Sequence, residues 1–61
     1  MSETATLTMA LTRPAKSRGG DRYECDYGGE RISVYVPQNL SRTNGTPAKL
    51  LTVTFAPYTK D

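Results

Sequence analysis

The side chains best suited to bind a ligand are cations that cluster in one short stretch. Four of the eight Lys and Arg residues fall within ten positions, and these four are Arg13, Lys16, Arg18 and Arg22. Grouped cations bind phosphate oxygens, and an exposed aromatic ring beside them can stack on a base. The cluster therefore predicts binding to a nucleic-acid strand. The competing interpretation is a charged loop that is simply solvated, which fits the mild net charge of +2.

Catalysis has little support in the same sequence. The chain has no His, so the usual general base near neutral pH is missing, and with one Cys it offers no plausible zinc ligand set. Cys25 lies in an alternating apolar pattern, where a thiol without a His partner is an inert packing residue. Glu24 and Asp26 alternate with it and are expected to pair across the sheet. We therefore predict a non-catalytic binding protein without a metal or cofactor.

A β-hairpin is expected at residues 22–36, where it would position part of the basic cluster. Gly28–Gly29 forms a two-residue turn of the kind that requires positive φ. With this turn, residues whose numbers sum to 57 face each other. Apolar pairs then fall on one face and polar pairs on the other: Cys25 with Ile32, Tyr23 with Val34, Asp26 with Arg31, Glu24 with Ser33, and Arg22 with Tyr35. Arg22, Arg31 and Tyr35 are thus expected close together, completing a candidate nucleic-acid site of Arg13, Lys16, Arg18, Arg22, Arg31 and Tyr35.

Two further strands are predicted from alternation. Residues 4–12 alternate Ala, Leu or Met with Thr, and residues 49–55 place Leu51, Val53 and Phe55 on one face. The connection at 14–21 is polar and glycine-bearing, and is expected to be mobile. The connection at 37–48 contains two prolines and an Asn–Gly pair, and one short helical turn is expected near Asn39–Arg42.

The predicted fold is a single all-β domain spanning residues 1–61, with frayed termini at 1–3 and 57–61. Four short antiparallel strands form one sheet, either as a meander or as a strongly curled half-barrel. In a meander the last strand pairs with the third strand. The long connection at 37–48 also allows the last strand to pair with the first.

A homodimer is expected because the chain supplies no helix to cover the apolar face of the sheet. At 61 residues the core is near the lower size limit for independent folding, and neither a disulfide nor a metal is available. A curled monomer is the alternative. Because the N-terminus lacks a basic and apolar leader pattern and the only thiol is unpaired, we expect a cytoplasmic protein. The alternative function is a protein-interaction module that acts through exposed edge strands, expected to be the first and the last.

Overall fold

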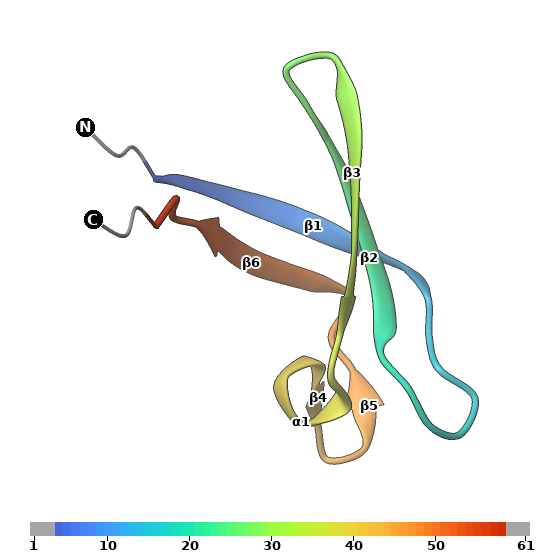
Figure 1. Ribbon diagram of the computed structural model, residues 1–61. Coiled ribbons are helices and arrows are strands. Elements are labelled where there is room, and N and C mark those ends of the chain that lie inside the picture. Colours follow the sequence, from blue (N-terminus) through green and yellow to red (C-terminus); the bar gives the residue numbers. More distant parts are fainter. Residues whose placement is uncertain (1–3, 59–61) are drawn as a thin grey trace.

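A computed structural model describes residues 4–58. The predicted fraying at 1–3 and at 59–61 lies outside the described residues, whereas residues 57 and 58, also predicted to fray, are exposed and belong to no strand. The elements, in chain order, are β1 (Ala5–Arg13), β2 (Asp21–Tyr27), β3 (Glu30–Val36), α1 (Gln38–Ser41), β4 (Arg42–Thr43), β5 (Thr46–Pro47) and β6 (Leu50–Phe55). β1, β2, β3 and β6 form one antiparallel sheet, and β4 with β5 forms a small second one (Figure 1). The fold is therefore mostly β, with one helical turn at Gln38–Ser41, one residue before the predicted Asn39–Arg42.

The β2–β3 hairpin has the register that the glycine turn requires. Pairing runs from Asp21 opposite Val36 to Tyr27 opposite Glu30, so the paired residue numbers sum to 57 throughout. Gly28 and Gly29 both adopt positive φ, at 61° and 85°. Glycine reaches this region without a Cβ clash, which is why the turn and the register are set together.

The strand order is β3-β2-β1-β6, so the last strand pairs with the first and the sheet is not a meander. β1 is consequently an interior strand, and the two edge strands are β3 and β6, which corrects the expectation that the first strand is an edge. The cause lies in the connection after β3, which folds into α1 and the β4–β5 hairpin instead of returning directly. The N–H of Leu11 then donates to the carbonyl of Lys49 at 2.9 Å, which brings the chain alongside β1.

The sheet consists of two ribbons that share only a short junction. β1 pairs with β6 from Ala5 to Ala10, but it pairs with β2 only from Ala10 to Arg13, with an irregularity in register at Thr12. Figure 1 shows the β1–β6 ribbon crossing the β2–β3 hairpin at a steep angle. A bulge increases local twist, so this irregularity accounts for part of the crossing.

The core lies where the two ribbons meet. Met9 of β1 and Tyr23 of β2 are fully buried, whereas the other inward-facing apolar residues of the sheet are half-buried or exposed. The Tyr23 hydroxyl donates a hydrogen bond to the carbonyl of Ala48 at 2.6 Å, which ties the end of the long connection to the core. Within residues 4–58, no helix has the length and apolar character needed to cross a membrane.

Tyr23→Phe is expected to lower the free energy of unfolding by about 1 kcal/mol, because the ring stays packed while the Ala48 carbonyl loses its donor. Urea denaturation measures this change. Tyr27→Phe is the matched control, since Tyr27 is 55% exposed and lies beside the hairpin turn. An equal loss of stability in both variants would contradict a specific role for the Tyr23 hydroxyl.

Candidate nucleic-acid interface

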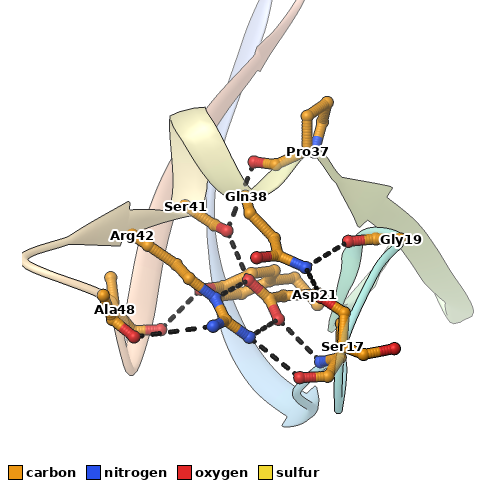
Figure 2. A network of polar contacts seen from close by, with 11 residues as sticks. Ser17, Gly19, Asp21, Pro37, Gln38, Ser41, Arg42 and Ala48 are labelled. Carbon is orange, nitrogen blue, oxygen red and sulfur yellow. Dashed lines mark hydrogen bonds and ion pairs between the residues drawn. The ribbon is translucent and has the colours of Figure 1, made fainter.

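The basic loop, residues 14–20 between β1 and β2, is anchored on the buried carboxylate of Asp21. Oδ1 accepts hydrogen bonds from the Ala15 N–H at 2.7 Å and from Arg42 Nη2 at 2.9 Å. Oδ2 accepts from the Ser41 hydroxyl at 2.5 Å and from Arg42 Nε at 3.1 Å. Figure 2 shows these contacts converging on Asp21 from the loop, α1 and β4. One carboxylate thus joins the start of β2 to the loop before it and to the connection after β3.

Arg42 and Gln38 also hold the loop backbone directly. Arg42 Nη2 also donates to the Ala15 carbonyl at 3.0 Å, and Gln38 Nε2 donates to the carbonyls of Ser17 and Gly19 at 3.1 and 2.9 Å (Figure 2). The loop that the sequence marked as mobile is therefore held at three of its residues by hydrogen bonds.

Close packing of the loop against β3 adds to these hydrogen bonds. A Cβ atom on Gly20 would lie 3.0 Å from the Val36 carbonyl oxygen and 3.1 Å from the Cβ of Tyr35. A side chain here would force the neighbouring backbone to shift by a few tenths of an ångström, so glycine lets the end of the loop lie directly beside Tyr35.

The electrostatics show that Asp21 is a structural anion. Hydrogen bonds from Arg42, from the Ser41 hydroxyl and from the Ala15 N–H hold the pKa of Asp21 far below its ordinary value, although burial opposes this shift. The hydrogen bond to Asp21 raises the pKa of Arg42 in turn. Burial, and secondarily the charge of Asp21, raises the pKa of the Tyr23 hydroxyl. An ionised carboxylate engaged by four donor contacts is poorly suited to accept a proton from a substrate, so this network organises the fold.

Beside the anchored loop lies a hollow that we call the basic groove. Its volume is about 400 Å³, and it is lined by Arg13, Pro14, Ala15, Lys16, Arg18, Gly19, Gly20 and Tyr35. A second hollow of about 530 Å³ shares Arg18, Gly19, Gly20 and Tyr35 with it, and is also lined by Ser17, Pro37 and Gln38. The Tyr35 ring is 64% exposed. Among the ion pairs of the described residues, none involves Arg13, Lys16 or Arg18, which leaves three cations and an exposed ring around one groove.

The other two predicted site residues lie on the polar face of the hairpin. Arg22 sits over the Tyr35 ring, 5.9 Å from its centre, and its Nε lies 2.7 Å from Glu24 Oε2 without hydrogen-bond geometry. Arg31 binds Glu24 at 2.7 Å and Asp26 at 2.8 Å. The hydrogen bond from Arg31 lowers the pKa of Glu24, and the same bond raises the pKa of Arg31. These four charges therefore compensate one another.

Arg31 does not join the basic groove. It lies four residues before Tyr35 on β3, a separation of about 13 Å along a strand. Its partner across the hairpin is Asp26, whereas the partner of Tyr35 is Arg22. The structure thus gathers Arg13, Lys16, Arg18 and Tyr35 around the groove, sets Arg22 beside them, and places Arg31 toward the hairpin turn.

Sequence reasoning missed the residues that position the loop: Asp21, Gln38, Ser41 and Arg42. Their partners are about 20 positions away in the chain. The sequence signal that could have singled them out is weak: Asp21 is the one acidic residue within a basic stretch.

Within residues 4–58, no group of three or more His, Cys, Asp or Glu side chains could hold a metal ion. Cys25 is half-buried on the apolar side of the hairpin, as its alternation predicted. The chain matches no known protein family, and comparisons with curated proteins and with solved structures found no significant similarity.

Proposed function

We propose that the protein binds single-stranded nucleic acid in the basic groove, without catalysing a reaction. Arg13, Lys16 and Arg18 would contact phosphates, and one base would stack on Tyr35. The observation that carries the proposal is the meeting, around one groove, of three cations outside any described ion pair and a ring that is 64% exposed. This combination of cations along a groove with an aromatic platform is typical of proteins that bind single strands.

The anchoring of the loop supports binding because it reduces the cost of ordering. Hydrogen bonds from Arg42 and Gln38 already fix the backbone that carries Lys16 and Arg18. A preorganised site loses less conformational entropy when its ligand arrives. The network around Asp21 thus contributes to affinity indirectly, by holding the loop beside Tyr35.

The charges on the hairpin are compatible with this proposal. Glu24 and Asp26 would repel phosphates if they were unpaired, but Arg22 and Arg31 pair with them. A single strand is favoured over a duplex because stacking on Tyr35 requires a base that is not already stacked between neighbours.

The test is a fluorescence-anisotropy titration of short single-stranded oligonucleotides at two salt concentrations. If three phosphates are contacted, affinity should fall roughly 20-fold between 50 and 200 mM salt. In the Lys16→Gln, Arg18→Gln variant, which keeps one of the three contacts, the fall should be roughly threefold and binding should be weaker at both concentrations.

A matched control uses single variants that each remove one lysine charge. Lys16→Gln should weaken binding and reduce the salt dependence, whereas Lys49→Gln, an exposed site before β6, should leave both unchanged. No binding by the wild-type protein at low salt would overturn the proposal. Equal losses of affinity in Lys16→Gln and Lys49→Gln would show that net charge, not the basic groove, governs binding.

A further inference from the structure

A further groove lies between β3 and β6, and Tyr35 is the only one of its lining residues that the nucleic-acid proposal uses. It has a volume of about 450 Å³ and is formed where the two edge strands approach each other. We call it the apolar groove, and its lining residues are Val34, Tyr35, Val36, Pro37, Leu40, Leu51, Thr52, Val53 and Thr54. β3 and β6 stand at opposite ends of the strand order, so the sheet must curl for both to line one groove.

The groove exposes groups that folded proteins usually cover. Leu40, on α1 at the rim, is 70% exposed, and the inward-facing valines are only half-buried. As edge strands, β3 and β6 each leave alternate backbone N–H and C=O groups without a partner in the sheet. Apolar surface and unpaired strand edges at one place are features of an interaction site.

The surface of the whole chain is larger than one compact protein of this size would show. The chain exposes 5026 Å² at a mass of 6.7 kDa, whereas a compact monomer of that mass exposes about 3,900 Å². The excess of about 1,100 Å² is spread over the whole chain, and it is comparable with the roughly 800 Å² that each partner buries in a standard interface. The radius of gyration, 13.0 Å, likewise exceeds the value of about 10.5 Å for a compact chain of this length.

Charge indicates which partner fits. A two-fold interface packs the same surface patch of both copies together, so a patch with charges of one sign would repel itself there. None of the nine residues that line the apolar groove is charged. The basic groove, by contrast, would place like charges together. We infer that a second copy of this chain docks on the apolar groove, and that the two copies are related by a two-fold axis.

The test is sedimentation analysis of the full chain over a micromolar to millimolar range. The wild-type protein should show a dimer of twice 6.7 kDa that dissociates on dilution. Leu40→Glu should weaken dimerisation by at least about tenfold, because the substitution occurs twice in a two-fold interface. Leu50→Glu is the matched control, since Leu50 is also exposed, at 62%, but does not line the groove. It should leave dimerisation unchanged.

Thr52→Glu, at a second exposed position of the groove, provides an independent substitution if Leu40→Glu alters the circular dichroism spectrum. Weakened dimers in the two groove variants, together with an intact dimer in Leu50→Glu, would support the inference. A wild-type monomer at every concentration would overturn it, as would dimers unaffected by both groove substitutions. The measurement contains no nucleic acid, so its outcome is independent of the binding proposal.

Discussion

Arg42→Met is expected to lower the Tm at neutral pH by roughly 10 °C or more. Arg42 supplies two hydrogen bonds to the fully buried carboxylate of Asp21. Methionine fills a similar volume but leaves that carboxylate buried without a counter-ion, which is far less favourable than losing both charges together. The variant also loses the hydrogen bond from Arg42 to the Ala15 carbonyl, so the basic loop should loosen.

The size of this loss should depend on pH. The pKa of Asp21 in the folded protein lies far below its ordinary value, so the ionised carboxylate stabilises the fold. This contribution is complete above the unfolded pKa of about 4, and it is lost as the pH falls below that value toward the folded pKa. Arg42→Met removes the hydrogen bonds that contribute most to the lowered pKa of Asp21. Ionisation of Asp21 therefore stabilises the variant less than it stabilises the wild type. The Tm difference between wild type and variant should therefore narrow below about pH 4.

Arg31→Met is the control for Arg42→Met. It removes the same charge, but the Arg31 side chain is 60% exposed, its partner Asp26 is 72% exposed, and Glu24 keeps the charge of Arg22 beside it. Exposed ion pairs contribute little to stability, so its Tm should stay close to that of the wild type. Thermal melts of the three proteins across the acid range provide the measurement. A deficit in Arg42→Met that stays constant with pH would mean that lost packing, not the ion pair, causes it.

The hairpin was predictable because its causes are local. Two glycines fix the turn, the turn fixes the register, and the resulting pairs sort by polarity without reference to the rest of the chain. The alternation in residues 4–12 and 49–55 likewise predicted β1 and β6, since the period of two depends only on which face is buried.

The strand order was not predictable in the same way. Leu51 and Val53 would face the core whether β6 paired with β1 or with β3, so the alternation does not distinguish the two arrangements. The structure fixes the order through contacts over long sequence separations: Ser41 and Arg42 with Asp21, and Lys49 with Leu11. A side chain such as Arg42, one cation among eight, carries no mark of its partner 21 residues away.

The same distinction applies to the candidate site. Arg13, Lys16 and Arg18 were found because they are close in sequence, and Tyr35 was placed near them through the hairpin register. Arg31 was included because it shares the polar face, but its position along β3 directs it to Glu24 and Asp26. Two residues on the same face of a strand need not be in contact, because the distance along the strand grows by about 6.6 Å for every two residues that separate them.

Tyr35→Ala is expected to reduce affinity for single-stranded oligonucleotides by roughly 5- to 150-fold, the range for loss of one base stacked on an aromatic ring. The dependence of affinity on salt should stay as in the wild type. Arg13, Lys16 and Arg18 remain in the variant, and salt dependence reports the number of phosphates contacted, not stacking. Substitutions at Lys16 and Arg18 should have the reverse signature, with a reduced salt dependence. Titrations at two salt concentrations separate the two contributions.

Two further variants complete the Tyr35 experiment. Tyr35→Phe keeps the ring and should retain most of the affinity, whereas Tyr27→Ala removes a ring that is 55% exposed but lies at the other end of the hairpin. It should bind as the wild type does. Because Tyr35 also lines the apolar groove, sedimentation of Tyr35→Ala at the titration concentrations must show the wild-type mass before its affinity is compared. A loss of salt dependence in Tyr35→Ala would contradict a stacking role. It would mean that the ring positions the cations of the basic groove, through its contacts with Arg22 above it and Gly20 beside it.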